Sequence, residues 1–532
     1  MQHIQLFHSE TGLLLRPIPT KTVTTGIYTK KVLWLIFYLS IFRGFLACTL
    51  ELGNDEAYYW LYSQDLKWNY FDHPPMVAVL IRIFTGNLAL QDYAGFLRLG
   101  SIVSCALSTW FLFKAVSVVH TSRAGWFAAI LYNASFYSGL TAGLFVMPDS
   151  PQMVFWTLSM WMIAKILREE GKWKHWFILG IAAGLCIMSK VHAGFIWIGF
   201  GLFILFKRRD LLKMPQLYVA ALLSALIASP ILIWNLEHDF VTYRFHSSRV
   251  TVDNSVEVKG AAREFVSQLI FNNPLNVALI AAGLIGLYQR KLARFEALTL
   301  FNWIGLPLAV VLLFVSFFKD TTLPHWSGPA YVTLLPLAAV NLSLVNKHSI
   351  FPQRLKWSLG LFIVVLTAWW GIVHFYPGTY GAKIPATFGR GDISLDTYGW
   401  KKASKEFKKI YDEDVAKGMM PANSALATTY WWGAHVEYYM SRPYNIQMLG
   451  IGNIIELREY WWMNQLRKQN SYPQFAYCIM PSDESYDLPE QFYNEIELAK
   501  VIEVMRNGRP AHYFRVYRLK GLKPTAAQLS LR

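Results

Sequence analysis

An acidic pair follows the first long apolar stretch of the chain. In Gly53-Asn54-Asp55-Glu56, Asn54 can cap a short helix whose first turn carries both carboxylates. Helical spacing places Tyr59 and its tyrosine neighbours on the same side as Asp55. A carboxylate held beside other polar groups can take a proton from a hydroxyl nucleophile, which predicts Asp55 as a general base and Glu56 and Tyr59 as substrate-binding residues. Carboxylates also favour the positive end of a helix dipole, so a structural interpretation stays open.

A second motif is Asp72-His73-Pro74-Pro75. Consecutive prolines fix an extended turn and remove two backbone donors just before an apolar stretch. Such a rigid turn can hold the His73 imidazole against a phosphate group as a donor, a cation or a proton shuttle. Asp72 can equally serve as a helix cap. Both side chains are candidate substrate-binding residues.

Three more ionisable residues stand at the ends of apolar stretches. Asp149 precedes one stretch, and Lys190 and His192 occupy a tight turn between two others. Asp149 can simply cap a helix, and Lys190 can extend its side chain to the membrane interface. An ionisable group at membrane depth is nevertheless a functional candidate, because leaving it unpaired there is costly. We predict that all three bind substrate.

Two later polar segments concentrate hydrogen-bond donors. One contains Arg244 and Arg249, and the other contains His325 after a proline. Arginine suits bidentate recognition of a phosphate, and histidine acts as a smaller charge. These residues are therefore predicted to bind the head group of a polyprenyl phosphate. Attraction of the two arginines to anionic lipid is the alternative.

The elements that must position these residues are apolar helices. Hydrophobic residues make up 54% of the 532 residues and charged residues only 16%, far below the roughly 25% of a soluble domain. Runs long enough to cross a bilayer as helices indicate a polytopic helical bundle rather than a barrel. We expect eleven transmembrane helices, at residues 32–51, 97–119, 124–146, 150–167, 175–189, 191–206, 216–235, 274–288, 297–318, 326–345 and 357–376.

Basic residues fix the expected orientation. With the N-terminus in the cytoplasm, every cytoplasmic loop carries lysine or arginine, as the positive-inside rule requires. The apolar stretch Met76–Ala89 would invert all later loops if it crossed the membrane, so we interpret it as a helix at the outer interface. The candidate residues then gather at the outer face of the membrane.

Three regions follow from this topology. Residues 1–31 form a cytoplasmic segment, and residues 32–376 form the transmembrane domain with outer loops 52–96 and 236–273. Residues 377–532 are mixed and charged, and are predicted to form a soluble α/β domain on the outer side. Within it, residues 398–418 favour a surface helix, and residues 424–431 and 475–482 favour strands.

Composition also excludes several functions. The formal net charge of +16 resides mainly in short loops between apolar runs, where topology explains it, so no nucleic-acid partner is expected. Three of the four cysteines fall inside apolar runs, which leaves no disulfide framework and no cysteine metal site. No glycine-rich phosphate loop is present, so no nucleotide site is predicted.

At these motifs the sequence resembles the C-type membrane glycosyltransferases of the protein O-mannosyltransferase and lipid A aminoarabinose transferase superfamily, over nearly all of residues 30–376. Asp55-Glu56 is similar to the acidic pair of the family's first outer loop, and Asp72-His73-Pro74-Pro75 to its Pro-Pro turn. Asp149, Ser189-Lys190 and Leu323-Pro324-His325 match later motifs in the same order. Aminoarabinose transferases have lysine where this chain has His73, which argues against an aminoarabinose donor.

The resemblance implies a GT-C fold and a function at the outer face of the membrane. The short loops favour a bacterial inner membrane, although a protein of the endoplasmic reticulum would obey the same topology rule. A sugar would pass with inversion from a polyprenyl-phosphate-linked monosaccharide to a hydroxyl or phosphate of a lipid, a surface glycan or a protein. Asp55 would act as the catalytic base. A divalent metal is compatible with the site but not required, no other cofactor is expected, and we expect a monomer.

Two alternatives stay open. A transporter or flippase of lipid-linked sugars would also need many spans, but it predicts broken helices in two matching halves and charges near the bilayer midplane. Transfer of a whole oligosaccharide or of a phospho-group would use the same outer residues. The gathering of charges at one face favours an enzyme over a transporter.

Overall fold

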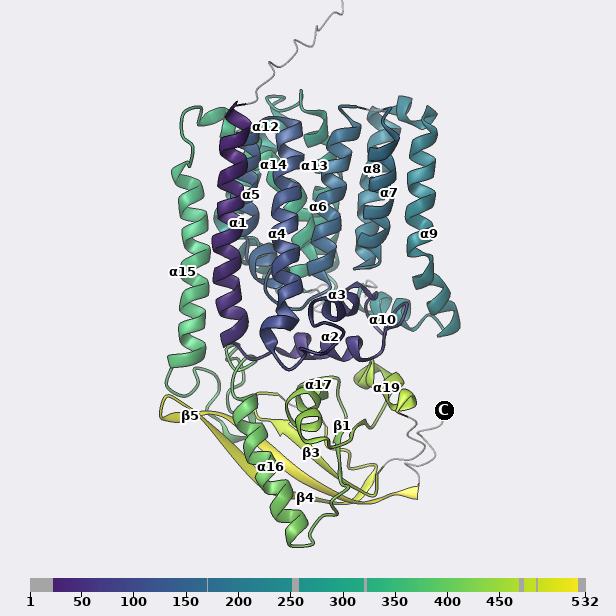
Figure 1. Cartoon of the computed structure of the whole chain (residues 1–532), viewed down its shortest axis with the longest axis vertical. Helices are drawn as coiled ribbons and strands as arrows, with labels where there is room; N and C mark the ends of the chain where they lie inside the picture. The colour runs from purple at the N-terminus through teal and green to yellow at the C-terminus, as the bar shows by residue number, and fades with distance from the viewer. Residues whose placement is uncertain are drawn as a thin grey trace, which may run out of the picture.

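The computed structural model describes residues 23–169, 171–250, 258–319, 323–467, 473–484 and 487–524. Most of the expected cytoplasmic segment 1–31 lies outside these ranges. The described chain forms a helical bundle at one end and a sheet domain at the other, with short helices between them (Figure 1). The C-terminal domain, here everything after Phe375, faces one end of the bundle.

The bundle contains a helix at each of the expected apolar ranges. Its long helices run nearly parallel in Figure 1: α1 (Val23–Thr49), α4 (Ala94–Val119), α5 (Ser122–Ala134), α6 (Asp149–Ile166), α7 (Trp173–Ile187), α8 (Phe195–Lys207), α9 (Pro215–Glu237), α12 (Pro274–Tyr288), α13 (Glu296–Val315), α14 (Gly328–Val345) and α15 (Gln353–Phe375). Among the described residues, six helices meet the length and hydropathy needed to cross a membrane, and the bent pair α11–α12 would be a seventh. The bundle is thus a polytopic membrane domain.

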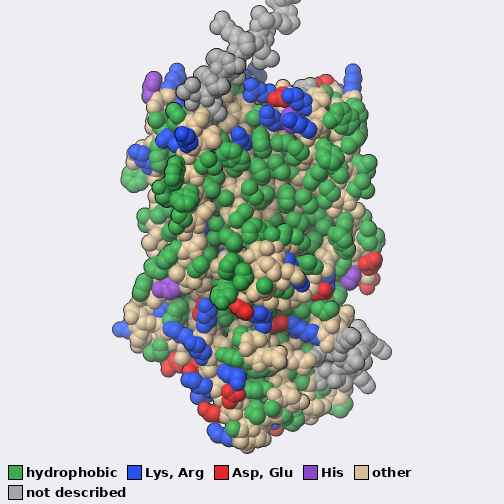
Figure 2. Space-filling view, viewed as in Figure 1, with side chains coloured by type: hydrophobic (Ala, Val, Ile, Leu, Met, Phe, Trp, Pro, Cys, Tyr) green, Lys and Arg blue, Asp and Glu red, His purple; other side chains and the backbone are tan. Residues whose placement is uncertain are grey.

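Side-chain types divide along the long axis of the molecule. Hydrophobic side chains cover the middle of the bundle, and lysine and arginine gather at the end farthest from the C-terminal domain (Figure 2). Inside the bundle, Trp156, Phe200 and Phe301 belong to a continuous apolar core. The exposed apolar belt matches the surface that hydrocarbon chains cover.

Short elements close the bundle end that faces the C-terminal domain. They are α2 (Asn54–Gln64), α3 (Met76–Phe84), the π-helical turn η1 (Tyr137–Thr141), the 3₁₀ turn η2 (Val191–Gly194), α10 (Val241–Val250), α11 (Val258–Phe271) and the 3₁₀ turn η4 (Pro324–Ser327). The 3₁₀ turn η3 (Arg209–Lys213) follows α8. The helix α3 lies across the end of the bundle in Figure 1, as the sequence predicted for an interfacial helix.

The C-terminal domain is a five-stranded mixed sheet with helices packed on it. Its strand order is β2-β1-β3-β5-β4, with β1 parallel to β2 and β3, and β5 antiparallel to β3 and β4. The strands are β1 (Ala425–Thr428), β2 (Met448–Gly450), β3 (Phe475–Pro481), β4 (Tyr493–Arg506) and β5 (Arg509–Leu522). The helical elements are η5 (Pro385–Thr387), α16 (Trp400–Ala416), α17 (Gly433–Val436), η6 (Glu437–Ser441), η7 (Arg442–Tyr444), α18 (Ile454–Leu457) and α19 (Tyr460–Leu466).

The helix and the two strands predicted for this domain are present in the structure. The expected surface helix is α16, whose buried residues Ala403, Phe407, Ile410 and Tyr411 recur at helical spacing and form one apolar face. The two expected strands are β1 and β3. The long hairpin of β4 and β5 was not predicted.

The C-terminal domain packs directly on the first outer loop. Tyr58 and Trp60 of α2 share one buried apolar cluster with Trp431 and Tyr438 of the domain. The backbone of Leu52 is held from both sides, since its N–H donates to the Tyr439 hydroxyl at 2.7 Å and its carbonyl accepts from His435 Nε2 at 2.7 Å. The loop that carries Asp55 is therefore fixed by the domain that follows the bundle.

Candidate active site

A cavity of about 780 Å³ lies between the bundle and the C-terminal domain. Both parts of the chain contribute polar side chains to its wall. From the outer loops and turns come Asn54, Asp55, Tyr59, Asp72, His73, His246, Arg249, His325 and Trp326. From the C-terminal domain come Arg390, Asp392, Asp396, Trp431, Trp432, Arg458, Asp483 and Glu484.

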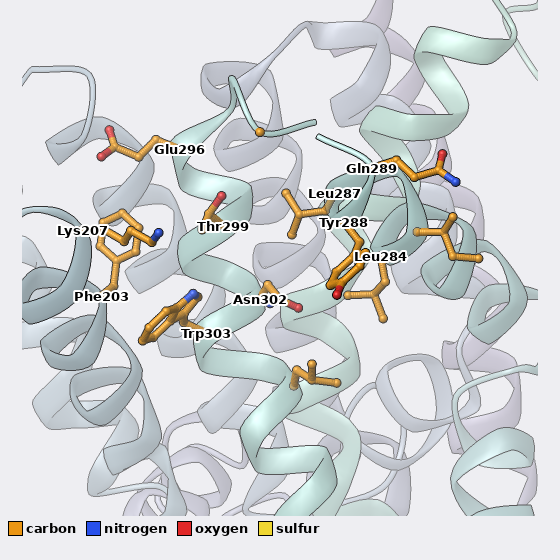
Figure 3. A pocket seen from close by; sticks show the side chains of 13 residues that line it. Phe203, Lys207, Leu284, Leu287, Tyr288, Gln289, Glu296, Thr299, Asn302 and Trp303 are labelled. Carbon is orange, nitrogen blue, oxygen red and sulfur yellow. The ribbon is translucent and has the colours of Figure 1, made fainter. Parts of the chain in front are cut away.

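A larger cavity of about 960 Å³ opens at the opposite end of the bundle. It lies between α8, α12 and α13, and Lys207 and Glu296 lie beside mainly apolar and amide side chains there (Figure 3). None of the residues that the sequence singled out for chemistry lines it. The candidate site is therefore the smaller cavity.

Asp55 lies in the first turn of α2 and points into the candidate site. The sequence predicted Asn54 as the cap, but α2 begins at Asn54, and its N-cap is Gly53. The Asn54 N–H donates instead to Asp396 of the C-terminal domain at 2.9 Å. A side chain at position 53 would collide with the Asp396 carboxylate, which explains the glycine there.

The surroundings of Asp55 tune its acidity. Its side chain is open to the cavity, but the protein around it displaces most of the bulk water. This desolvation, reinforced by the charges of Asp72 and Glu56 and opposed by Arg458 and Lys190, raises the pKa of Asp55 to about 6. A carboxylate with this pKa is ionised at neutral pH and is a stronger base than an ordinary aspartate.

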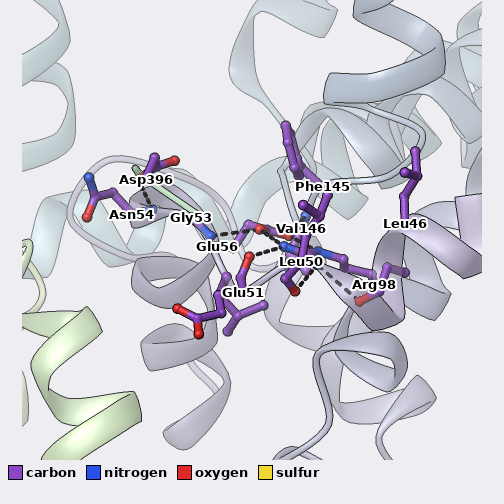
Figure 4. Close-up of polar contacts among 12 residues, drawn as sticks. Leu46, Leu50, Glu51, Gly53, Asn54, Glu56, Arg98, Phe145, Val146 and Asp396 are labelled. Carbon is purple, nitrogen blue, oxygen red and sulfur yellow. Dashed lines mark hydrogen bonds and ion pairs between the residues drawn. The ribbon is translucent and has the colours of Figure 1, made fainter. Parts of the chain in front are cut away.

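Glu56, expected to bind substrate, does not line the cavity. It forms a buried ion pair with Arg98, whose Nη2 lies 2.5 Å from Glu56 Oε2. Arg98 also donates to the carbonyl oxygens of Leu50 and Glu51, and Glu56 accepts the N–H groups of Gly53 and Val146 (Figure 4). Every oxygen of Glu56 is thus occupied in joining α1, α2 and α4. Glu56 therefore has a structural role and not the substrate-binding role that the sequence predicted.

Asp72 stands at the cavity wall and is held by several donors. The hydroxyls of Tyr62 and Tyr58 approach its Oδ1, and Arg458 Nη1 lies 3.3 Å from its Oδ2. Its backbone carbonyl accepts from His246 Nε2 at 2.6 Å. These contacts fix the turn in which the next residue, His73, sits.

His73 lies among aromatic and basic side chains in the cavity. Its ring centroid is 5.7 Å from that of Tyr59 and 5.8 Å from that of His246. Burial, followed by the positive charge of Lys190 and the neighbouring His246, lowers the pKa of His73 well below its usual value. The imidazole is therefore neutral at pH 7 in the ligand-free protein, and it can donate a hydrogen bond to an anion that enters.

Asp149 and Lys190 form a buried pair that does not line the cavity. Lys190 Nζ lies 2.8 Å from Asp149 Oδ2, and the Tyr137 hydroxyl donates to Asp149 Oδ1 at 2.9 Å. The π-helical turn η1 presents Tyr137, which the sequence did not reveal. His192 lies apart, accepting from Gln152 Nε2 at 3.0 Å.

The helix α10 contributes the two residues that lie on its cavity-facing side. His246 and Arg249, three residues apart, share the face toward the cavity, and the Arg249 guanidinium stands 4.8 Å from the Trp326 ring centroid. Arg244 falls on another face, is exposed and does not line the cavity. His325 and Trp326 enter from η4, where Pro324 begins the turn. Of the two arginines, only Arg249 joins the site.

The C-terminal domain supplies site residues that sequence reasoning missed. Asp396, Trp431 and Arg458 lie in segments without a recognisable motif. Most of the chain separates Arg458 from Asp55 in the sequence. Burial, with the charges of Asp55 and Glu56, raises the pKa of Asp396 to about 7. In the ranges that the structure describes, no three His, Cys, Asp or Glu side chains are grouped as a metal site.

Comparisons with known proteins cover part of the sequence and most of the fold. The family model of dolichyl-phosphate-mannose-protein mannosyltransferase matches residues 72–234. The lipid A galacturonosyltransferase RgtD of Rhizobium johnstonii is 23% identical over 311 residues, which are 58% of this chain and 62% of that protein. This chain thus covers less than two thirds of that relative.

The fold comparison extends over both parts of the molecule. The crystal structure of ArnT from Cupriavidus metallidurans in the apo state superposes with a TM-score of 0.60 and 11% identity, covering 92% of this chain and 98% of that one. The matched region includes the bundle and the C-terminal domain. The chain thus shares the fold of that protein, a polytopic membrane bundle followed by a C-terminal sheet domain.

Proposed function

We propose that this protein is an inverting glycosyltransferase that takes a sugar from a polyprenyl-phosphate-linked monosaccharide. The observation that carries the proposal is that Asp55, His73, Arg249 and His325, from four separate segments, line one cavity at the end of an apolar bundle. The cavity wall thus combines a carboxylate that can act as a base with donors for a phosphate. A lipid-linked donor needs both, next to a surface that holds its hydrocarbon tail.

The proposed reaction is one displacement. Asp55 takes the proton of the acceptor hydroxyl, and the acceptor oxygen forms a bond to the anomeric carbon while the bond from that carbon to the phosphate oxygen breaks. The bonding electrons leave with the polyprenyl phosphate. A single attack from the opposite side inverts the anomeric carbon.

Stabilising the departing phosphate is the task of the basic side chains. Arg249 offers a guanidinium fork, while His73 and His325 offer imidazole donors. A donor aimed at charge that develops during the reaction is often worth about 3 kcal/mol of barrier. Because the leaving group is already a weak base, the mechanism requires no acid to protonate it.

The acceptor is proposed from the relative's name and the place of the site. RgtD is named as a transferase acting on lipid A. A hydroxyl or phosphate of lipid A, or of a similar outer-face glycolipid, would reach the cavity from the membrane surface. Surface glycans and protein hydroxyls are the other acceptors to test.

The orientation is proposed from the distribution of charge. Lysine and arginine gather at the bundle end away from the cavity, which the positive-inside rule assigns to the cytoplasm (Figure 2). The cavity and the C-terminal domain would then lie in the periplasm of a bacterial inner membrane. A membrane-impermeant thiol reagent on whole spheroplasts should label a cysteine at exposed Ile393 and not one at exposed Tyr288. The reverse labelling would invert the topology.

The decisive test is the release of polyprenyl phosphate by the purified protein. Undecaprenyl-phosphate-linked sugars, galacturonic acid, mannose and glucose among them, would be offered with lipid A. Asp55→Asn should reduce release about 100-fold or more, the scale of losing a general base. Asp65→Asn, at the other end of α2 and outside the cavity, is the matched control. Equal release by the wild type and Asp55→Asn would remove Asp55 from the mechanism.

A further inference from the structure

Arg458 is a site residue that comes from the C-terminal domain. It lies between α18 and α19, lines the cavity with Asp55, and its side chain is 19% exposed. The bundle alone, with all its outer loops, would lack this guanidinium. The position raises the question of what Arg458 binds.

The contacts of Arg458 orient its guanidinium without using all its donors. Nη1 lies 3.3 Å from Asp72 Oδ2, and the guanidinium stacks 4.4 Å from the ring centroid of Trp431. Its Nε is buried, yet it has no hydrogen-bond partner among the described residues. A buried donor without a partner is costly, so the surrounding packing must hold the guanidinium in place against that cost.

The backbone at Arg458 is strained. Its φ is 51° and its ψ is −120°, a combination that glycine adopts freely and other residues avoid. Such conformations persist only where the surrounding structure imposes them, and they cluster at ligand sites. The strained residue lies between α18 and α19 and lines the cavity.

Arg249 provides a second guanidinium across an aromatic ring. Arg249 and Arg458 lie 5.5 Å and 5.3 Å from the ring centroid of the same residue, Phe245. The two cations would repel each other in isolation, and Asp72 offsets part of that repulsion. Two guanidinium groups at one cavity are a suitable arrangement for a tetrahedral anion with several oxygens.

We propose that Arg458 binds the phosphate of the polyprenyl-phosphate substrate together with Arg249, so that the C-terminal domain completes the donor site. This inference rests on the proposed function and deepens it. The domain then has two tasks, holding the loop of Asp55 and closing the phosphate site. Arg458 also places a positive charge near Asp55.

The first test is equilibrium binding of undecaprenyl phosphate to the full-length protein in detergent, which needs no turnover. Arg458→Gln should weaken binding about tenfold or more, the scale of losing a charged hydrogen-bond donor. The affinity of Arg458→Lys should lie between those of the wild type and Arg458→Gln, because lysine keeps the charge but loses the stacking and the planar fork. Arg442→Gln, which removes an exposed domain-to-loop ion pair with Asp92 outside the cavity, should bind as the wild type does.

Arg458→Gly separates binding from folding. Glycine adopts this backbone conformation without strain, so this variant should unfold at a temperature no lower than Arg458→Gln does. It should nevertheless bind undecaprenyl phosphate as weakly as Arg458→Gln. Binding within twofold of the wild type by both variants would overturn the assignment of Arg458 while leaving the proposed function intact. Absence of binding by the wild type would instead overturn both.

The second test is the pH dependence of release. Asp55 is faced by the cations of Arg458 and Lys190, by the carboxylates of Asp72, Glu56 and Asp396, and by the Tyr59 hydroxyl. Removing one cation raises the pKa of Asp55, so the acid limb of Arg458→Gln should move to higher pH, and that of Arg458→Lys should stay near the wild type. The same midpoint in all three proteins would contradict the positive charge that this assignment places beside the reacting groups.

Discussion

Asp55 combines access to the cavity with a pKa near neutrality, and both have the same origin. The first turn of α2 turns the carboxylate toward the cavity, and the protein around it removes bulk water. Desolvation then raises its pKa more than Arg458 and Lys190 lower it. Glu56, the next residue, points the other way into its pair with Arg98. The two neighbouring carboxylates therefore differ: Asp55 lines the cavity, and Glu56 holds the surrounding helices together.

The acidity of Asp55 predicts an acid limb in the rate. A general base works when deprotonated, so kcat/KM for polyprenyl phosphate release should rise with pH through about 6, the pKa of Asp55, and level off above it. Initial rates in a buffer series of constant ionic strength would measure this. A rate that is flat across that range, or that falls, would contradict the role of Asp55 as base.

The pair of Arg98 and Glu56 predicts a large loss of stability. Arg98→Gln leaves a buried carboxylate without its partner, which should cost about 3–5 kcal/mol of folding free energy. Thermal unfolding in detergent, followed by tryptophan fluorescence, would show it. Adding Glu56→Gln should recover part of the loss, because the orphaned group is then neutral. Arg354→Gln, at an exposed arginine in the first turn of α15, should unfold as the wild type does.

At the scale of elements, α2 is oriented by groups outside the bundle. Asp396 accepts the Asn54 N–H, and the Glu51 carboxylate accepts the N–H of Trp400 at the start of α16 at 2.7 Å. The C-terminal domain thus caps the start of α2, and the segment before α2 caps the start of α16. Because a misplacement of about 1 Å can cost a hundredfold in rate, these caps bear on catalysis as well as on stability.

Tyr439 tests this orientation directly. Tyr439→Phe removes the hydroxyl that accepts the buried Leu52 N–H, and an unpaired buried donor costs about 1–3 kcal/mol. We expect a lower unfolding temperature and slower release of polyprenyl phosphate. Tyr513→Phe is the matched control, since its hydroxyl makes one long contact of 3.4 Å at the surface. Equal effects of the two variants would argue against a positioning role for Tyr439.

At the scale of the whole molecule, the bundle and the C-terminal domain behave as one body around the cavity. The shared cluster of α2 and the domain is apolar and aromatic, so salt screens it little. Lys67 adds an ion pair to the buried Glu459 at 2.6 Å. Tyr58, Trp60 and Tyr62 of α2 thus belong to the same buried core as residues of the C-terminal domain.

This packing predicts that a cut between the two parts leaves them together. A protease site inserted after Ile384, whose side chain is 65% exposed, would allow cleavage of the folded protein. The two fragments should elute as one complex in detergent at low and high salt. They should also retain release activity. Separation of the fragments at low salt would show that the interface is weaker than its buried aromatic cluster indicates.

The sequence determined the elements and the order of the motifs. Each apolar run became a helix of the bundle, because a chain in lipid must satisfy its backbone within each segment. The turn before Met76 placed His73 at the cavity, since two prolines leave the backbone few alternatives. The helix α16 and the strands β1 and β3 followed from local periodicity in the same way.

The tertiary structure decided which of the candidate residues meet. Local spacing gives no information on pairs such as Glu56 with Arg98, 42 residues apart, or Asp72 with Arg458, 386 residues apart. Local spacing also does not reveal which face of α10 meets the cavity. In the structure Arg249 lies on that face, and Arg244 lies at the surface. The sequence alone does not decide these partners, because burial and pairing depend on segments that come together only when the whole chain folds.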